Sequence, residues 1–355
     1  MDRDDRISVI MPAHDAAAFL PWALPPLIAL REAGEVLEVI VADDAATDGS
    51  AGIARALGAE VLSLPRNAGP AAARNAAAAR ARGGILWFVD SDVVVGRGGP
   101  ARIRAALAQP AVGAVFGAYD AHPADPHWFS RYKNLAHRFY HLQAGRQAPG
   151  EAPGQVGGRA QTFWAGCGAV RADLFRTLGG FDAQAYPRPS IEDIELGYRI
   201  AAAGRAIAVD PGLEACHLKG WRMGPTIRND IANRALPWSR LIASREGLGD
   251  TLNIGRAERA RAVLAAALLL ALLAALAGLG SPGASWGLAG LLALAALAAN
   301  AALFRFLART GGLGVALGGL AFHQVYYLYS AVSFAWCQIE ARLAPAPAVA
   351  SGRRR

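Results

Sequence analysis

Acidic residues that follow short apolar runs are the side chains with the clearest chemical potential in this chain. Asp90-Ser91-Asp92 comes directly after the apolar run Ile85 to Val89. Carboxylates at alternate positions supply the hard oxygen ligands that Mg²⁺ and Mn²⁺ prefer, with positions left open for substrate phosphates. We therefore predict a divalent-metal site at Asp90 and Asp92. The alternative is a solvated turn, because a DxD sequence arises by chance in many loops.

Two further polar residues suit a nucleotide. Asp44 follows another apolar run, Leu37 to Ala42, and could accept a hydrogen bond from a nucleobase N–H. Arg74 lies one turn into a helix that begins near Pro70, and its guanidinium could meet a base or a phosphate. The alternative for Arg74 is an ordinary surface side chain. Asp48 and Ser50, in contrast, are interpreted as helix caps.

Adjacent acids open a predicted helix from Ser190 to Gly204. Ser190 followed three residues later by Asp193 also fits a capping box, which is the structural alternative. However, Glu192 and Asp193 together exceed what a cap needs. A carboxylate at a helix N-terminus stays ionised, which suits a general base waiting for a hydroxyl proton.

A basic and imidazole pair follows the short strand-like run Ala206 to Val209. His217 could complete a metal shell, and Lys219 could hold a diphosphate. A lone histidine is more often structural, so both interpretations of His217 stay open.

These residues need a scaffold that brings them to one place. Strand-like runs alternate with helical patterns, which predicts βαβ units, a mostly parallel sheet and helices on both faces. In such sheets the ligand site lies beyond the carboxyl ends of the strands, where the polar residues above fall. The predicted strands are Ile7 to Met11, Leu37 to Ala42, Glu60 to Leu64 and Ile85 to Val89, and the predicted helices are Ala16 to Ala33, Ala51 to Leu57 and Ala71 to Ala81.

Two other segments have distinct compositions. Residues 145–158 are rich in Gly, Pro and Gln and are predicted to form a mobile loop. The segment Trp128 to Leu142 mixes aromatic and basic residues. It fits either an interfacial helix or an ordinary amphipathic helix packed on the sheet.

Composition narrows the class of protein. Of 355 residues, 54% are hydrophobic and 18% are charged, whereas soluble domains have a charged fraction of about 25%. A disordered protein is excluded. The 3 cysteines form no CxxC pair, which excludes a disulfide scaffold and a cysteine-cluster zinc site. The net charge of +8 is dispersed apart from Arg353 to Arg355, which favours anionic lipid over nucleic acid as a partner.

The C-terminal part predicts membrane helices. No charged residue occurs from Ala262 to Phe304, and Gly280-Ser281-Pro282-Gly283 divides this run into halves of spanning length. We predict helices over about 262–280 and 285–304 and a possible third over 312–339. A buried helical core is the alternative. Flanking arginines on both sides place the N-terminal domain in the cytoplasm. The predicted organisation is a catalytic domain over 1–255 with an interfacial segment over about 220–250, a membrane region over 256–340 and a basic tail over 341–355.

From about Ile7 to His217 the chain resembles glycosyltransferase family 2, whose members have the GT-A fold, a Rossmann-like α/β sheet. The resemblance is carried by seven blocks in order: SVIMPAHDAAAFL, VIVADDAATDGS, RNAGPAAARN, WFVDSDV, FWAGCGAVR, GGFD and EDIELGYR. The segment HLKGW and the residues after it resemble the membrane-anchored branch that acts on lipid acceptors.

The resemblance implies a role for each matched residue. Asp193, with Glu192, would act in catalysis as the base of an inverting transfer. Asp92, with Asp90 and His217, would hold Mn²⁺ or Mg²⁺, and Lys219 would contact the diphosphate. The donor would be bound by Pro12, His14, Asp44, Arg74, Asp90 and Ser91, and the acceptor side would be lined by Gly166, Cys167 and Gly168.

The implied function is transfer of one sugar from a UDP-, GDP- or dTDP-sugar to a lipid or lipid-linked acceptor at the cytoplasmic face of the inner membrane. If the acceptor is a lipid phosphate, no base is needed and Asp193 would only orient it. Two departures from the family pattern stand out: Ala45-Ala46 replaces the usual Gly-Ser, and the QxxRW signature of processive members is absent. A nucleotidyltransferase and a catalytically silent membrane scaffold are the alternatives.

Overall fold

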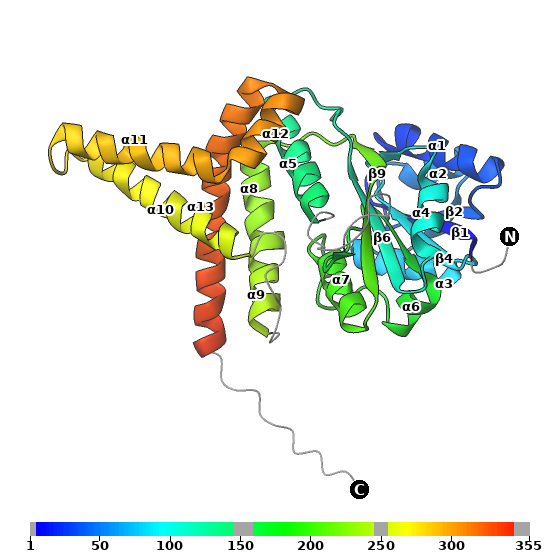
Figure 1. Ribbon diagram of the computed structural model, residues 1–355. Coiled ribbons are helices and arrows are strands. Elements are labelled where there is room, and N and C mark those ends of the chain that lie inside the picture. The colour runs from blue at the N-terminus through cyan, green and yellow to red at the C-terminus, as the bar shows by residue number, and fades with distance from the viewer. Residues whose placement is uncertain (1–4, 145–158, 245–254, 344–355) are drawn as a thin grey trace, which may run out of the picture. The chain divides into compact units, whose positions relative to one another are not determined.

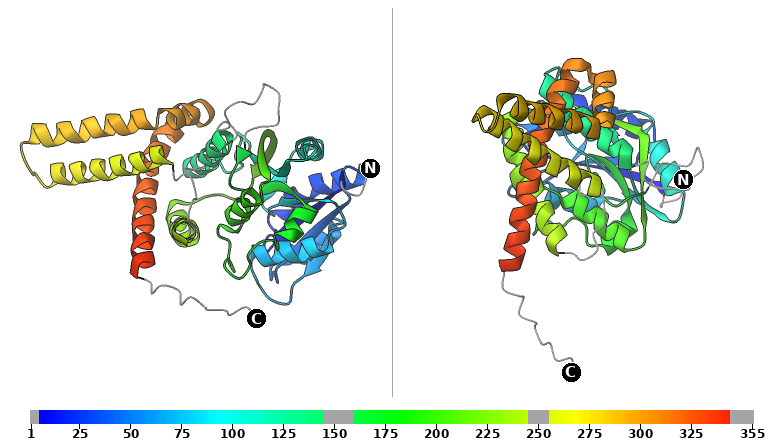
Figure 2. Two further views of the ribbon diagram at one scale, coloured as in Figure 1. Left: turned by 60° about the horizontal axis from the view of Figure 1, so that its bottom comes forward. Right: turned by 60° about the vertical axis from the view of Figure 1, so that its left-hand side comes forward.

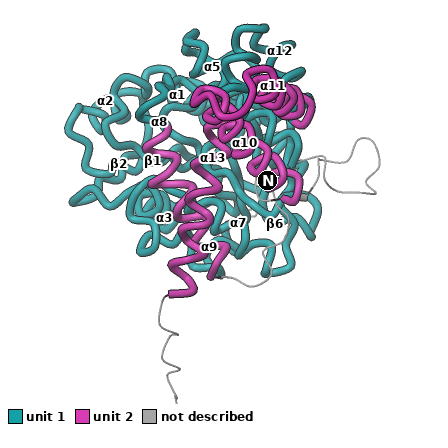
Figure 3. The backbone as a smooth tube through the Cα atoms, turned by 90° about the vertical axis from the view of Figure 1, so that its left-hand side faces the viewer, with its two compact units in different colours: residues 1–226, 300–321 teal, residues 227–299, 322–355 magenta. Residues whose placement is uncertain are grey.

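The computed structural model describes residues 5–144, 159–244 and 255–343, and the chain divides into two compact units (Figure 3). One unit comprises Met1–Thr226 and Asn300–Ala321, and the other comprises Ile227–Ala299 and Phe322–Arg355. The predicted mobile loop over 145–158 and most of the predicted basic tail lie outside the described residues. The unit that contains the predicted catalytic residues therefore takes in a segment from beyond the apolar helices.

Among the described residues, a 9-stranded sheet forms the centre of the first unit, with the path β3-β2-β1-β4-β8-β6-β9-β5 and β7 paired to β9 (Figure 1). Strands β1, β2, β4 and β6 are buried along their whole length, as expected for a sheet covered on both faces. The strands are β1 Ile7–Ala13, β2 Glu38–Asp43, β3 Glu60–Ser63, β4 Ile85–Val89, β5 Val93–Val95, β6 Val112–Tyr119, β7 Arg159–Ala160, β8 Cys167–Arg171 and β9 Ala206–His217.

The sheet is mixed, so the prediction of a mostly parallel sheet is only partly right: in its second half β6 and β9 pair in parallel, and the other pairs are antiparallel. Strands β1 to β4 pair in parallel, as predicted. Strand β8 runs antiparallel to β4 and β6, because it starts at the edge where β4 ends: Cys167 pairs with Val89. The direction of a strand depends on the edge at which the chain re-enters the sheet. This direction cannot be predicted from an apolar run in the sequence.

Helices cover both faces of this sheet (Figure 1, Figure 2). Helices α1, α2 and α4 belong to one layer: α1 contacts α2, and Arg104 on α4 donates to the Glu35 carbonyl after α1. Helices α3, α6 and α7 belong to another layer, in which Arg74 on α3 pairs with Glu192 on α7 and Arg176 on α6 donates to the Ala81 carbonyl after α3. Their bounds are α1 Leu20–Glu32, α2 Ser50–Ala56, α3 Pro70–Arg80, α4 Gly99–Leu107, α6 Ala172–Thr177 and α7 Glu192–Ala202.

Helix α5, Trp128–Ala144, packs on strands β6 and β9. Phe129 and Leu135 are fully buried in it, which agrees with the amphipathic-helix alternative rather than with the interfacial one. Helix α12, Ala301–Gly311, lies against α5, where the rings of Phe139 and Phe306 are 5.4 Å apart. The segment after the apolar helices therefore completes the cover of this unit.

The second unit is helical. Its first helices are α8 Met223–Asp230, the π-helix η2 Ile231–Ala235 and α9 Leu236–Ser244, which occupy the predicted interfacial segment. They are bonded to α13, Leu313–Leu343, through Tyr329 and Asp230 at 2.9 Å and through Arg240 and Glu340 at 3.0 Å.

Two helices of this unit are long and apolar enough to cross a membrane. They are α10, Arg256–Leu276, and α11, Pro282–Ala299, and only 11% of each apolar window is buried in protein. A buried helical core, the alternative interpretation, would have most of these apolar residues covered by protein. Helix α13 does not meet the same criterion among the described residues, and the predicted second helix over 285–304 ends at Ala299 because Asn300 leaves the helical conformation.

The loop after β2 holds a strained residue. Ala45 has φ = 54°, a left-handed conformation that costs a residue with a Cβ about 1–2 kcal/mol. This is the position where the family pattern has glycine. The substitution in this chain therefore keeps the loop conformation at an energetic cost.

Replacing Ala45 with glycine is expected to stabilise the protein by about 1 kcal/mol, because glycine adopts this φ without strain. The melting temperature of the detergent-solubilised chain should rise by about 2–4 °C. Ala46→Gly is the matched control: φ of Ala46 is not positive, so the variant should melt at or below the wild-type temperature. Equal shifts for both variants would contradict the assignment of strain to Ala45.

Candidate active site

The predicted site lies where the order of the strands reverses. Strands β2 and β3 extend from one side of β1, and β4 lies on its other side. In open α/β sheets, such a switch point leaves a crevice beyond the carboxyl ends of the strands. Pro12 is buried near the end of β1, and Asp90 to Asp92 follow β4, so these residues lie at the switch point.

The loops after β1 and β2 are bonded to each other. The backbone N–H of Ala17 donates to Asp48 at 2.8 Å, and that of Ala16 donates to the Ser50 hydroxyl at 2.8 Å. The N–H of Thr47 donates to Asp15, also at 2.8 Å. Asp48 also accepts from the N–H of Ser50 at 3.0 Å, at the start of α2, as a capping side chain would, although the N-cap residue is Gly49. Asp48 and Ser50 in addition join two loops, a role that the prediction of helix caps did not include.

Asp44 anchors a third loop. Its two carboxylate oxygens accept hydrogen bonds from the N–H groups of Ala68 (2.7 Å) and Gly69 (2.8 Å), and only 3% of the residue is exposed. Its carbonyl lies 2.9 Å from Nδ1 of His14, whose side chain is 42% exposed. Of the predicted donor-binding residues, His14 is the one that presents a large exposed side chain here, and Asp44 fixes the loop around it.

Asp92 and His217 come together beyond β4, whereas the carboxylate of Asp90 pairs with Arg74. Nε2 of His217 lies 3.5 Å from Oδ2 of Asp92, because β5 pairs with the end of β9. Burial by itself would raise the pKa of the Asp92 carboxyl, but His217 and then Lys219 lower it below its usual value. Lys219 is exposed. Ser91, which lies between Asp90 and Asp92, is half-buried.

The Asp92 carboxylate and the His217 imidazole have the chemistry of divalent-cation ligands. Within the described residues, no group of three or more His, Cys, Asp or Glu side chains has a ready metal-holding geometry. Mn²⁺ and Mg²⁺ are commonly held by one or two carboxylates together with substrate phosphates. His217 is 4% exposed, and its Nε2, the nitrogen that lies 3.5 Å from Asp92, would be a further donor at this place.

Asp193 lies in the first turn of α7 and is held from two sides. Oδ2 accepts from the N–H of Ala165 at 3.1 Å, and Oδ1 accepts from the N–H of Ile194 at 2.8 Å. Burial, followed by the like charge of Glu192, raises the pKa of Asp193 to about 6, although these bonds and the Arg74 charge oppose the rise. A carboxyl with this pKa can take up a proton near neutral pH.

The capping-box alternative does not hold. Helix α7 has Ile191 at its N-cap, with no side-chain cap hydrogen bond. Glu192 is 5% exposed and accepts from the N–H of Ser190 and from Arg74. Both of its oxygens therefore have partners within the protein, which favours a structural use of Glu192 over the predicted catalytic one.

The predicted acceptor-side residues differ in what they can reach. The Gly166 carbonyl accepts from the N–H of Asp90 at 3.2 Å. A Cβ at Gly168 would lie 2.3 Å from the Trp164 carbonyl, so glycine is required for close packing there. Cys167 is fully buried and burial raises the pKa of its thiol to about 12. Its side chain is therefore unavailable to an acceptor, contrary to the prediction.

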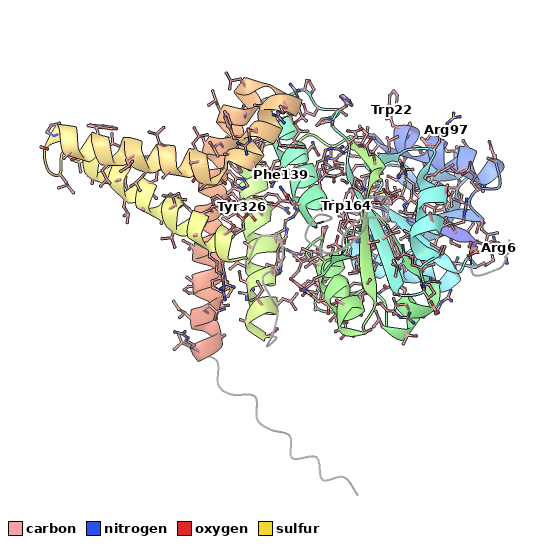
Figure 4. All side chains as sticks on the ribbon, in the orientation of Figure 1. Arg6, Trp22, Arg97, Phe139, Trp164 and Tyr326 are labelled. Atoms are coloured by element: carbon pink, nitrogen blue, oxygen red, sulfur yellow. The ribbon has the colours of Figure 1, made fainter. Side chains whose placement is uncertain are left out.

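An aromatic cluster beside the predicted acceptor side was missed from the sequence. The ring of Trp164 (Figure 4) lies 4.9 Å from Tyr119, 5.2 Å from His137 and 4.8 Å from His141. Tyr119 also lies 4.8 Å from the ring of His217. The spacing of His137 and His141, four residues apart on one face of a predicted helix, was the available signal.

These features define an α/β domain with a crevice at the switch point of its sheet and carboxylates in the loops beside it. Within that class, the Glycosyl transferase family 2 profile matches residues 8–170. An N-acetylglucosaminyltransferase of Rhizobium leguminosarum bv. trifolii is 30% identical over 132 residues, which cover 35% of this chain and 72% of that relative. The chain belongs to glycosyl transferase family 2.

Two further similar proteins are also named as sugar transferases. Validoxylamine A glucosyltransferase of Streptomyces hygroscopicus subsp. jinggangensis is 30% identical over 241 residues, 59% of this chain and 56% of that protein. The chain thus spans about half the length of the glucosyltransferases it matches. A mannosyltransferase from Pyrobaculum calidifontis, solved with GDP-Man and Mn²⁺, has a TM-score of 0.53 at 19% identity, covering 93% of this chain and 87% of its own, which supports the fold.

Asp193→Asn is expected to stabilise the protein above pH 6. The pKa of Asp193 is raised from 3.8 to about 6, so the folded state binds the proton more tightly than the unfolded state does. Its ionisation therefore costs stability progressively as the pH rises from about 4 to about 6. At pH 8 the gain on substitution should be about 2 kcal/mol after allowance for partial exposure.

Melting temperatures of both proteins from pH 4 to pH 8 test this. The difference should be small at pH 4 and reach a plateau above pH 6. A constant difference over the whole range would contradict the buried, raised-pKa environment of Asp193.

Proposed function

We propose that this protein transfers one sugar, with inversion, from a nucleotide-sugar donor to a lipid or lipid-linked acceptor at the cytoplasmic face of a membrane. The observation that carries the proposal is the placement of Asp193 against the same segment as the predicted metal carboxylate. Ala165 bonds to Asp193, and the next residue, Gly166, bonds to Asp90. Family membership supplies the reaction class.

The proposed donor is a UDP-, GDP- or dTDP-sugar. His14 and the loops fixed by Asp44 and Asp48 would surround the nucleoside, with Pro12 and Ser91 beside it. Mn²⁺ or Mg²⁺ would be held by Asp92, Asp90 and His217, and when bound it would offset the charge that develops on the diphosphate. The exposed Lys219 ammonium would contact the same diphosphate.

In the proposed reaction Asp193 removes the proton from the acceptor hydroxyl. The acceptor oxygen forms a bond to the anomeric carbon as the bond from that carbon to the diphosphate oxygen breaks. The electron pair leaves with the nucleoside diphosphate, and the proton stays on Asp193 until it passes to solvent. Attack from the face opposite the leaving group inverts the anomeric configuration.

The proposed membrane attachment rests on α10 and α11. Leu270, Leu273 and Leu276 of α10 are 67%, 53% and 71% exposed, and leucines of α11 are exposed to a similar extent. Helices that leave such surface uncovered by protein suit lipid. Arginines in the first turns of α10 and in α12, which follows α11, favour a cytoplasmic catalytic unit.

Asp193→Asn should leave donor binding near the wild-type level and reduce turnover by about 10²–10⁴-fold, because the general base is lost. Asp92→Asn should instead abolish the stimulation by Mn²⁺. Sugar transfer from radiolabelled donor to a membrane lipid extract measures the turnover and its stimulation by Mn²⁺. Arg102→Lys is the control, since the Arg102–Asp210 pair lies outside the candidate site.

Full turnover in EDTA would refute the metal assignment. A loss of donor binding in Asp193→Asn, with turnover reduced only in proportion, would make Asp193 a structural residue.

Replacing residues 262–299 with a short Gly-Ser linker is expected to release the protein from membranes. Nε of Arg261 donates to the Ala299 carbonyl at 2.9 Å, so the two ends of the removed segment are adjacent. The variant keeps α12, which covers α5. The full chain should resist alkaline extraction from membrane pellets and the variant should not. Retention of a folded variant in the pellet would show that α10 and α11 are not the anchor.

A further inference from the structure

Three charged side chains from distant parts of the chain meet in the layer that contains α3 and α7. Nη2 of Arg74 lies 2.6 Å from Oδ1 of Asp90, and Nη1 lies 2.9 Å from Oε1 of Glu192. The side chains of Arg74 and Glu192 are each 6% exposed, and that of Asp90 is 33% exposed. The guanidinium therefore bridges the end of β4 to the start of α7.

Each end of this bridge is fixed independently. The N–H of Asp90 donates to the Gly166 carbonyl, and the second carboxylate oxygen of Glu192 accepts from the N–H of Ser190 at 2.9 Å. The guanidinium carbon lies 5.5 Å from the centroid of the Phe181 ring. Asn75 in turn bonds to the N–H and the carbonyl of Phe181, at 2.9 and 2.8 Å.

The chemistry of arginine suits this bridge. A planar guanidinium presents donors in a fixed fork, so one side chain can hold two carboxylates at a set separation, which a lysine ammonium on a flexible stem does not do. Both terminal nitrogens of Arg74 are used inside the protein. This arrangement does not favour the predicted contact of Arg74 with a base or phosphate of the donor.

We infer that Arg74 and Glu192 are positioning residues that set the distance between Asp90, in the turn that carries the proposed metal ligand Asp92, and the helix that presents Asp193. The inference rests on the proposed metal-dependent transfer. Glu192 acts on its neighbour Asp193 through the start of α7, and Arg74 links that start to Asp90. Metal and base are thereby held in one frame before any substrate arrives, and misplacement of either reacting group by about 1 Å can cost about 10²-fold in rate.

The test uses the full detergent-solubilised chain as wild type, Arg74→Lys, Glu192→Gln and the double variant. Arg102→Lys is the matched control, because it makes the same change in an ion pair away from the bridge. Mn²⁺ affinity is measured without substrate from the electron paramagnetic resonance signal of free Mn²⁺. Values of kcat and donor KM are measured with the nucleotide-sugar that the wild type turns over.

Each single variant should lower kcat by about 10²-fold, with donor KM within about threefold of wild type. Mn²⁺ affinity should fall by about 10-fold, as when other residues that orient metal ligands are lost. The kcat and the Mn²⁺ affinity of the double variant should be no lower than those of the less active single variant, because both changes break the same bridge. If Arg74→Lys does not fold, Glu192→Gln carries the test, since glutamine keeps the size of the side chain.

The outcomes separate the inference from the proposed function. A rise in donor KM at unchanged kcat would make Arg74 a donor contact and overturn the inference. Variants with wild-type Mn²⁺ affinity and kcat would overturn it as well, while leaving the proposed function intact. A wild-type chain that neither binds Mn²⁺ nor transfers sugar would overturn the proposed function, and the inference with it.

Discussion

The carboxylates crowded beyond β4 and at the start of α7 impose the constraint on which the rest of the site depends. Asp90, Asp92, Glu192 and Asp193 are drawn to one sheet edge, and like charges at low exposure raise each other's energy. The buried Arg74 guanidinium offsets part of this charge. The remaining negative charge would favour a divalent cation, which is the partner that we propose for this edge of the sheet.

Sequence pattern predicted the first half of the sheet closely. Strands β1 to β4 and helices α2 and α3 fall within two residues of the predicted bounds, because each apolar run is short and followed by turn chemistry. The antiparallel return of β8 could not be predicted, since an apolar run has no direction. The assignment of α12 to the first unit also depends on a contact between Phe139 and Phe306 that no local pattern reports.

Site residues could be predicted where a local motif contains them. They could not be predicted where the partner of a side chain lies far away in the sequence. Asp90, Asp92 and His217 follow predicted strands, Asp193 opens a predicted helix, and the fold brings Asp92 and His217 together. The use of Asp44 to hold the Ala68–Gly69 backbone was not foreseen, nor was the burial of Cys167. Arg74 and Glu192 are 118 residues apart, so their pairing follows from the topology of the sheet rather than from either motif.

Binding of nucleoside diphosphates by the detergent-solubilised chain tests the central claim most directly. UDP, GDP and dTDP are added separately, with Mn²⁺ or with EDTA, and the melting temperature is recorded. A ligand that binds the folded state alone stabilises it in proportion to the logarithm of its concentration over Kd. The account predicts that one of the three raises the melting temperature with Mn²⁺ and much less with EDTA. No shift with any of them, at millimolar concentration and with Mn²⁺ present, would contradict it.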